Sequence, residues 1–352
     1  MDSEPVVVAI LHPPEWCGSE GEFDAAVAAL EAVDPRVEVV QATYVEDHER
    51  RSARGLDTDP SLRADAPPVP DEVRAALGRA EVAVAIDLPF DVAELAPRLR
   101  WVQSVGAGTT QLQSAGLGPA GIRLTSNAGA NSVGIAEFAI GRLLEAAKRF
   151  RELDALQVEH RWEPLYGPQL QGRTIGLLGY GPINRAVAVR AHAFGMPVLA
   201  TRRTEGAPPE PPVEAFFAPD RLHEMLGRCD AVVAAVPETP ETAGMMDAAA
   251  FRAMRPGATF VNVGRGSLVD EAALVDALRS GHLGAAAIDV AHREPLPADD
   301  PLWDVPGLAV SAHCASSPTG MFAALYRHVA DNLARHLRGR SLVDEVDLVR
   351  GY

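Results

Sequence analysis

The sequence predicts an α/β protein built from two doubly wound parallel sheets. Its 352 residues are enough for two domains of ordinary size. Short apolar runs of strand character alternate with helical patterns in two successive series, as expected when helices cover both faces of a parallel sheet. Many of the strand-like runs end in glycine or polar residues, where such sheets bind their ligands.

The first series extends from the N-terminus to about residue 127. The predicted strands are VVVAIL, VEVVQA, VAVAI and LRWVQSV, and helices are predicted near 23–33 and 71–79. Residues 45–68 are polar and contain several prolines, so we expect an exposed loop or insertion there and not a folded element. Trp101, in the last of these strands, is expected to pack in the core of this domain.

The second series begins with a long helical pattern from about residue 131. The strand-like runs that follow are TIGLL, PVLAT, CDAVVAAV, TFVNV, AAIDV and LAVS, with helices expected up to about 195 and over 270–280. The Pro-rich stretch 207–219 is expected to be a surface loop, and Trp303 to pack in the core. A helical tail follows Pro318. The predicted domains are therefore 1–127 plus 318–352 and, between them, 128–317.

Charge and composition exclude several classes of protein. The net charge of −16 opposes nucleic acid and anionic lipid, and no apolar run approaches the roughly 20 residues of a membrane span. No signal peptide is evident, so a cytoplasmic protein is expected. Cys17, Cys229 and Cys314 form no metal-binding or disulfide pattern, so we expect reduced thiols and no metal.

A glycine turn between a strand and a helix predicts a dinucleotide site. In LLGYGPINR, Gly179 permits a tight turn and Gly181 lets the backbone approach a pyrophosphate, while Pro182 suits the first helical position. Asn184 takes the place of the usual third glycine. Because that glycine serves mainly helix–strand packing, we expect the asparagine to reduce the closeness of the helix without abolishing the site. A plain strand-to-helix turn is the alternative interpretation.

The end of the next strand indicates which dinucleotide is preferred. An NAD site would place an acidic residue there, about 20 residues beyond the glycines, for the ribose 2′-hydroxyl. The sequence has Arg202 and Arg203 instead, whose guanidinium groups suit a 2′-phosphate. NADP(H) is therefore the preferred cofactor, with NAD(H) possible, unless these are two ordinary surface arginines.

Three later segments each place one reactive side chain after a strand: VNVGRGS carries Arg265, AIDVAHREPLP carries Glu294, and VSAHCAS carries His313. With NAGANSVGIAEFAIG, LQGRTIGLLGYG and VPETPETAG, these segments make the chain resemble the D-isomer-specific 2-hydroxyacid dehydrogenase family. The likeness covers most of the chain and is closest to the glyoxylate/hydroxypyruvate reductase branch. It implies a flavodoxin-like substrate domain and an NAD(P)-binding Rossmann domain with a cleft between them.

The resemblance also assigns roles to particular residues. Histidine titrates near neutral pH, so His313 would act as the general acid and base, with Glu294 orienting its ring. Arg265 would bind the carboxylate and the carbonyl oxygen of the substrate. The substrate-binding turn would comprise Val105, Gly106 and Ala107. The cofactor-binding residues would be Gly179, Gly181, Pro182, Ile183, Arg202, Arg203, Pro237, Thr242, Val263 and Asp289.

The function implied is NAD(P)H-dependent reduction of a small 2-oxo acid to the D-2-hydroxy acid. One alternative is NAD-linked oxidation of a larger D-2-hydroxy acid. Another is a dinucleotide-sensing scaffold similar to the corepressor relatives of the family, although the intact Arg-Glu-His set argues against pure sensing. The long helix from residue 131 resembles the dimer-forming element of the family, so a homodimer is expected.

Overall fold

The computed structural model describes residues 4–56, 61–203, 210–317 and 320–348. These residues form two compact units, Met1–Asn131 with Ser317–Tyr352, and Ser132–Ser316. The expected boundary at 127/128 lies four residues before the observed one, and that at 317/318 one residue after it. The division shows that the C-terminal segment returns to the first unit.

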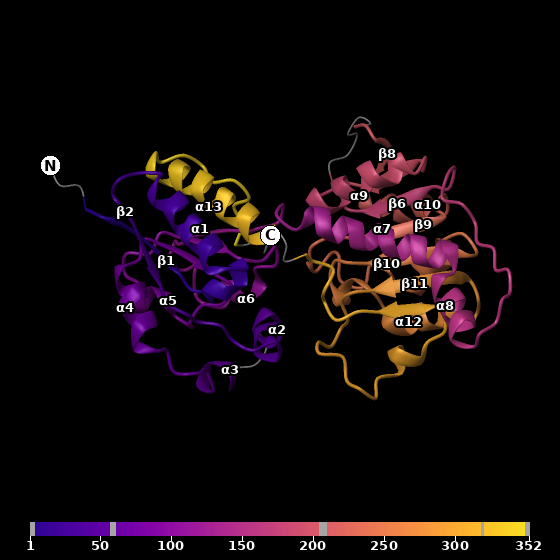
Figure 1. Cartoon of the computed structure of the whole chain (residues 1–352), viewed down its shortest axis with the longest axis horizontal. Helices are drawn as coiled ribbons and strands as arrows, with labels where there is room; N and C mark the ends of the chain where they lie inside the picture. The colour runs from indigo at the N-terminus through magenta and orange to yellow at the C-terminus, as the bar shows by residue number, and fades with distance from the viewer. Residues whose placement is uncertain (1–3, 57–60, 204–209, 318–319, 349–352) are drawn as a thin grey trace. The chain divides into compact units, whose positions relative to one another are not determined.

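The first unit is a five-stranded parallel sheet in the order β2-β1-β3-β4-β5. The strands are β1 (Val6–Ile10), β2 (Val37–Gln41), β3 (Val82–Ala85), β4 (Trp101–Ser104) and β5 (Arg123–Thr125). The helices are α1 (Glu20–Glu31), α2 (His48–Leu56), α3 (Ser61–Ala64), α4 (Asp71–Arg79), α5 (Val92–Leu95), α6 (Thr110–Gln113) and α13 (Met321–Leu337). The helices α1 and α13 lie side by side (Figure 1). This strand order is flavodoxin-like.

The second unit contains a seven-stranded parallel sheet, ordered β12-β11-β10-β9-β6-β7-β8. Its strands are β6 (Ile175–Leu178), β7 (Val198–Thr201), β8 (Val213–Phe217), β9 (Ala231–Ala234), β10 (Ala258–Asn262), β11 (Leu283–Ile288) and β12 (Leu308–Val310). Its helices are α7 (Ser132–Lys148), α8 (Phe150–Val158), α9 (Pro182–Ala193), α10 (Leu222–Leu226), α11 (Ala248–Ala253) and α12 (Glu271–Arg279). The strand order reverses beside β6, which is the switch point where doubly wound sheets bind ligands.

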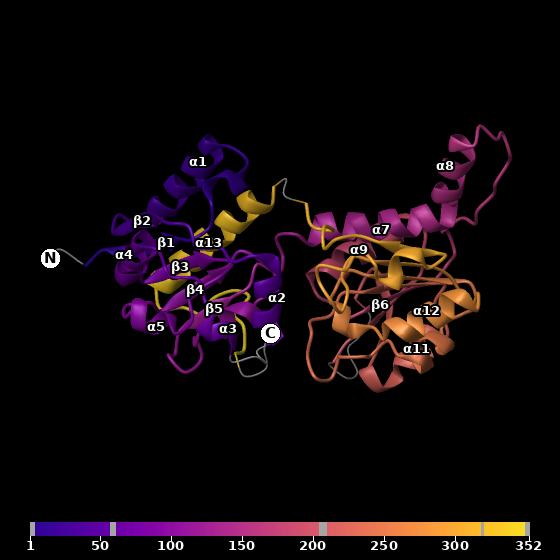
Figure 2. The same ribbon diagram turned by 90° about the horizontal axis from the view of Figure 1, so that it is seen from below.

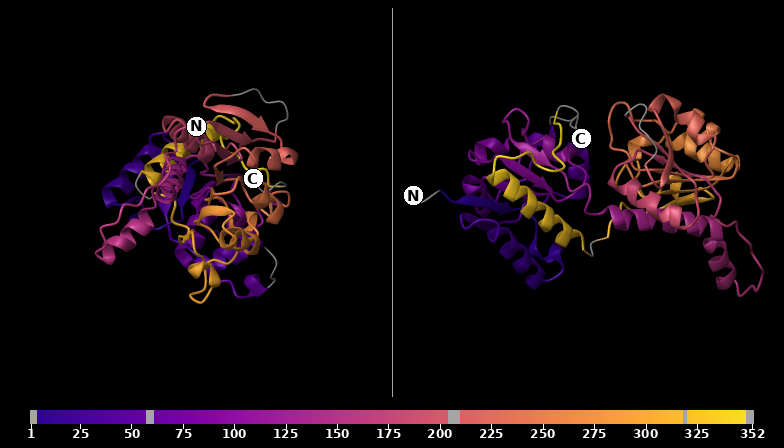
Figure 3. Two further views of the ribbon diagram at one scale, coloured as in Figure 1. Left: turned by 90° about the vertical axis from the view of Figure 1, so that its right-hand side faces the viewer. Right: turned by 90° about the horizontal axis from the view of Figure 1, so that it is seen from above.

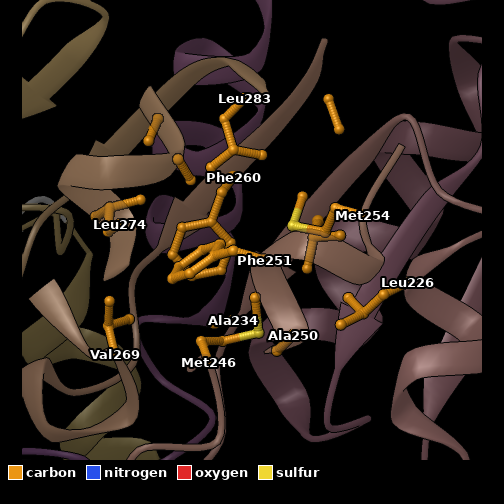
Figure 4. Packing of buried hydrophobic residues seen from close by; sticks show 14 of the residues in the cluster. Leu226, Ala234, Met246, Ala250, Phe251, Met254, Phe260, Val269, Leu274 and Leu283 are labelled. Carbon is orange, nitrogen blue, oxygen red and sulfur yellow. The ribbon is translucent and has the colours of Figure 1, made fainter. Parts of the chain in front are cut away.

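Hydrophobic burial fixes this second sheet between two layers of helices. Residues of β6, β7 and β9 are fully buried, because helices cover both faces. On one face Phe251 of α11 meets Phe260 of β10 edge to face, with ring centroids 5.3 Å apart (Figure 4). On the other face α7 and α9 lie against the strands and each other (Figure 3). The carboxyl ends of the strands are thereby held in fixed register.

The prediction of an exposed loop or insertion without a folded element at 45–68 is wrong for the part that the structure describes, while residues 57–60 lie outside the described residues. The segment contains α2 and α3, and Arg54 of α2 is 1% exposed and pairs with the buried carboxylate of Glu46 at 2.6 Å. Arg51 binds Asp87 through two nitrogens, at 2.8 and 2.7 Å. Helix α2 is fixed by ion pairs and not by an apolar stripe, so hydrophobic periodicity could not reveal it.

Two smaller expectations are also wrong. The stretch 207–219 is not simply a surface loop, since its described part contains the edge strand β8, which buries Val213 and Phe217. Residues 204–209 lie outside the described residues. Trp101 is fully buried as expected, but Trp303 is 46% exposed and donates from its indole nitrogen to the carbonyl of Pro297. Trp303 is therefore not a core residue.

Candidate active site

The glycine turn joins the end of β6 to the start of α9. Gly179 has φ +80°, and a Cβ there would lie 2.5 Å from Cγ1 of Val236. Only glycine fits such a position. A Cβ on Gly181 would meet no heavy atom within 4 Å. The helix N-terminus therefore faces open space, with backbone N–H groups and a positive dipole end that suit a pyrophosphate.

Asn184 braces this turn from inside the protein. Its side chain is buried, and Nδ2 donates to the carbonyl oxygens of Leu178 at 2.7 Å and Gly179 at 2.8 Å. The amide thus ties the end of the strand and the glycine turn to the first turn of the helix. Asn184 occupies the place of the third glycine with hydrogen bonds that a glycine could not make.

The residues after β7 form the adjoining corner of the site. The hydroxyl of Thr201 accepts from the amide of Gly179 at 2.7 Å, which connects the strand end to the glycine turn. Arg202 follows directly, and its Nη1 lies 3.6 Å from Oε2 of Glu210. The pKa of Glu241 is lowered, first by the side-chain hydrogen bond with Thr239 and to a smaller extent by the charge of Arg203.

Other expected cofactor residues line the same carboxyl edge of the sheet. Thr242 donates to the carbonyl of Pro237 at 2.8 Å and accepts from the amide of Thr239, so a compact turn follows β9. Val263, which follows β10, is buried, and Ile183 lies half-buried in the first turn of α9. Thus the turn after β9 at this edge is stabilised by hydrogen bonds between its own polar groups.

His313 and Glu294 meet at the ends of β12 and β11. Nδ1 of His313 lies 2.8 Å from Oε2 of Glu294, and Oε1 of the same carboxylate accepts from the amide of Ala291 at 3.0 Å. The glutamate is the more buried partner, with its side chain 19% exposed against 46% for the histidine. The carboxylate therefore fixes the plane of the ring and places the proton of the neutral imidazole on Nδ1.

Asp289 holds the turn that carries His313. Its carboxylate accepts from the hydroxyl of Ser311 at 2.7 Å and from the amides of Cys314 at 3.0 Å and Ala315 at 2.8 Å. Its carbonyl accepts from the amide of His313, which has a left-handed backbone with φ +51°. From sequence, Asp289 is expected only as a cofactor contact. Its bracing role has no sequence signal, because two of the three donors to its carboxylate are backbone amides.

Arg265 follows β10, the neighbour of β11 in the sheet. Its Nη1 donates to the carbonyl of Gly264 at 2.7 Å, and its own carbonyl accepts from the side-chain amide of Asn262 at 2.8 Å. Burial lowers the pKa of Arg265, while the carboxylates of Glu238 and Glu294 raise it. Arg265, Glu294 and His313 thus come from the ends of three adjacent strands. Glu238, in the turn after β9, was not singled out by sequence.

The expected substrate turn belongs to the first unit, at the carboxyl end of β4. The amide of Gly106 donates to the hydroxyl of Ser104 at 3.2 Å, and Asn127 bonds the carbonyls of Val105 and Gly106. Ala107 follows in the same turn. These bonds hold the turn in one conformation beside the sheet edge.

Among the residues that the structure describes, no group of three or more His, Cys, Asp or Glu side chains is arranged to hold a metal ion. None of their helices combines the length and apolar character needed to cross a membrane.

Comparison with known proteins identifies the family. Residues 140–315 match the family described as D-isomer specific 2-hydroxyacid dehydrogenase, NAD binding domain. A glyoxylate reductase of Korarchaeum cryptofilum is 33% identical over 255 residues, covering 71% of this chain and 76% of that protein. A D-3-phosphoglycerate dehydrogenase of Mycobacterium leprae is 32% identical over 279 residues, 76% of this chain. The chain spans only 50% of the length of that relative.

A solved structure extends the likeness over both units. It is an NADPH-dependent glyoxylate/hydroxypyruvate reductase of Sinorhizobium meliloti in complex with NADP and sulfate. The TM-score is 0.74 at 27% identity, and the match covers 99% of this chain and all of that one. The fold and the glycine turn together place the protein in the class of doubly wound α/β proteins that bind dinucleotides. The chain belongs to the D-isomer specific 2-hydroxyacid dehydrogenase family, on its glyoxylate/hydroxypyruvate reductase-like branch.

Proposed function

We propose that the protein reduces a small 2-oxo acid of the glyoxylate or hydroxypyruvate type to the D-2-hydroxy acid with NADPH. The observation that carries the proposal is the 2.8 Å bond between His313 and Glu294 beside Arg265, at the ends of adjacent strands. This arrangement supplies a positioned proton donor and a fixed cation, the two groups that reduction of a 2-oxo acid requires.

The glycine turn fits the cofactor. The space over Gly181, the free first turn of α9 and the guanidinium of Arg202 together suit the pyrophosphate and the 2′-phosphate of NADP(H). Pro237, Thr242, Val263 and Asp289 would border the rest of the dinucleotide. When bound, the reduced nicotinamide supplies a hydride to the keto carbon.

Residues of the chain would then stabilise the negative charges of the substrate and supply the proton. Arg265 holds the substrate carboxylate and stabilises the negative charge that develops on the carbonyl oxygen. His313 gives the proton from Nε2 to that oxygen, so that the alkoxide becomes the hydroxyl of the product. Glu294 keeps the ring in place through Nδ1 and stabilises the imidazolium before the proton leaves. The turn of Val105, Gly106 and Ala107 would contact the second carboxylate oxygen. Ala107 is its candidate backbone donor, because the amide of Val105 donates to the carbonyl of Ala85 and that of Gly106 to the hydroxyl of Ser104.

A homodimer is part of the proposal. Helix α8 and the segment after it project from the sheet of the second unit (Figure 2), and they expose Phe150, Val158, Trp162 and Tyr166. Large exposed apolar side chains grouped on one arm are typical of a covered surface, and a second copy of the chain would cover it. Light scattering should then give twice the mass of one chain.

The activity is tested by the absorbance of NADPH with glyoxylate and hydroxypyruvate, and with D-3-phosphoglycerate and NAD⁺ for the oxidative alternative. We expect faster turnover with NADPH and the 2-oxo acids. His313→Ala should lower kcat by about 100-fold or more, since general acid catalysis contributes about that much. The control His292→Ala removes a histidine that bonds the carbonyl of Val269, and should stay within about threefold of the parent. Cofactor binding without turnover of any acid would contradict the proposal and favour a sensing scaffold.

A further inference from the structure

A carboxylate stands among the arginines beside the glycine turn. Glu210 lies just before β8, and its Oε1 is 2.5 Å from Nη1 of Arg185, which belongs to the first turn of α9. Its Oε2 is 3.6 Å from Nη1 of Arg202, after β7. One carboxylate is therefore shared by two guanidinium groups from different elements.

Two aromatic rings hold these guanidinium groups in place. Tyr180 of the glycine turn meets Phe216 of β8 edge to face, with ring centroids 5.1 Å apart. The guanidinium of Arg185 lies 4.7 Å over the Tyr180 ring, and that of Arg202 lies 5.4 Å over the Phe216 ring. Stacking restricts arginine rotamers, so both cations stay directed at one position even when the anion between them changes.

The inference rests on the proposed use of NADPH. We propose that Glu210 is a specificity-determining residue that occupies, on Arg185 and Arg202, the position of the ribose 2′-phosphate. A nucleotide with a 2′-phosphate must displace this carboxylate from the arginines. A nucleotide with a 2′-hydroxyl does not need the arginines, so Glu210 lowers the preference for NADPH over NADH. Arg185, which lies directly after Asn184, is thereby a second phosphate-binding arginine.

Exposure makes the displacement feasible. The side chains of Arg185, Arg202 and Glu210 are 46%, 37% and 41% exposed, so water and salt screen both pairs. A phosphate monoester carries nearly two negative charges near neutral pH and accepts more hydrogen bonds than a carboxylate does. The 2′-phosphate should therefore displace the Glu210 carboxylate from the arginines, but the competing carboxylate reduces the affinity for the nucleotide.

Calorimetry with two fragments tests the inference without turnover. The probes are 2′,5′-ADP, which carries the 2′-phosphate, and 5′-AMP, which lacks it. In Glu210→Gln we expect 2′,5′-ADP to bind about threefold to tenfold more tightly, the effect of removing one competing surface charge, and 5′-AMP to change less than about twofold. The control Glu214→Gln makes the same change of net charge at an exposed position on β8, and should alter neither fragment. In Arg185→Ala, 2′,5′-ADP should bind more weakly.

The outcomes separate this inference from the proposed function. Unchanged binding of 2′,5′-ADP to Glu210→Gln, together with weaker binding to Arg202→Ala, would overturn the role of Glu210 and leave the NADPH preference standing. Equal binding of both fragments to the parent protein, unaffected by Arg202→Ala, would remove the phosphate site and the role of Glu210 with it. In turnover assays, Glu210→Gln should lower the KM for NADPH while kcat stays the same.

Discussion

At the scale of single residues, the candidate site depends on side chains that brace the backbone around the proposed catalytic groups. Asn184 holds the glycine turn, and Asp289 holds the turn of His313 through two backbone amides and a hydroxyl. Both side chains are buried, so each hydrogen bond is made away from water and its loss leaves a backbone group unsatisfied. Neither side chain is one of the proposed catalytic groups, yet each fixes the backbone next to them.

Asn184 offers a direct comparison of two structural roles. In Asn184→Ala the carbonyls of Leu178 and Gly179 each lose a donor, and we expect the unfolding free energy to fall by about 1–2 kcal/mol and NADPH to bind more weakly. Asn184→Gly restores the usual third glycine but also removes both donors. Urea unfolding and calorimetric titration with NADPH check both variants. Tighter NADPH binding by the glycine variant than by the parent would show that close packing, and not bracing, limits the site.

At the scale of elements, the segment 45–68 shows how charged groups can fix a helix. Arg54 of α2 bonds Glu46, the carbonyl of Leu88 and the hydroxyl of Ser114, and its guanidinium lies 4.0 Å over the ring of Phe90. These partners tie α2 to the loop that follows β3. That loop is at the carboxyl edge of the sheet, so α2 sets its conformation where a substrate domain would contact its ligand.

Two arginines over the same ring give a matched test of this helix. Arg54→Met leaves the buried carboxylate of Glu46 without its cation, which should lower the unfolding free energy by about 3–5 kcal/mol. Arg63 also stacks on Phe90, but it pairs with Asp91 at the surface. Arg63→Met should therefore cost less than about 1 kcal/mol. Urea unfolding curves measure both, and equal losses in the two variants would contradict a stabilising buried pair.

The alternation of elements could be predicted from sequence because the strands are continuous apolar runs and the helices between them are long. The Arg265, Glu294 and His313 segments could be placed at strand ends for the same reason. Helix α2 could not, since its partners Glu46 and Ser114 are polar and Ser114 is 60 residues away. Likewise, the pairing of Arg185 with Glu210 joins residues 25 positions apart that only the order of β6, β7 and β8 brings together.

At the scale of the whole molecule, the first unit is built from both ends of the chain, and residues near β1 pack against helix α13. His12 follows β1, and its Nε2 lies 2.7 Å from the hydroxyl of Tyr326 on α13, 314 residues later. Its ring stacks on Trp16, with centroids 6.0 Å apart, and packs against Phe322. Docking of α13 thus encloses a histidine among aromatic rings. The stability of this unit should therefore depend on the charge of that histidine.

Burial lowers the pKa of His12 below its usual 6.5, although the Pro13 carbonyl and the Glu15 carboxylate raise it by less. Below pH 6.5 the unfolded chain binds a proton that the native residue does not. The unfolding free energy therefore decreases as the pH is lowered from 6.5 to the native pKa of His12. The loss is at most about 1.4 kcal/mol per pH unit.

Tryptophan fluorescence can report on the first unit alone. Trp162→Phe and Trp303→Phe, both at exposed sites, leave Trp16 and Trp101 as reporters of the first unit. In that background, urea unfolding at pH 7 and pH 5.5 should show a smaller loss for His12→Gln than for the parent. Equal losses would mean that other groups control the acid sensitivity of this unit.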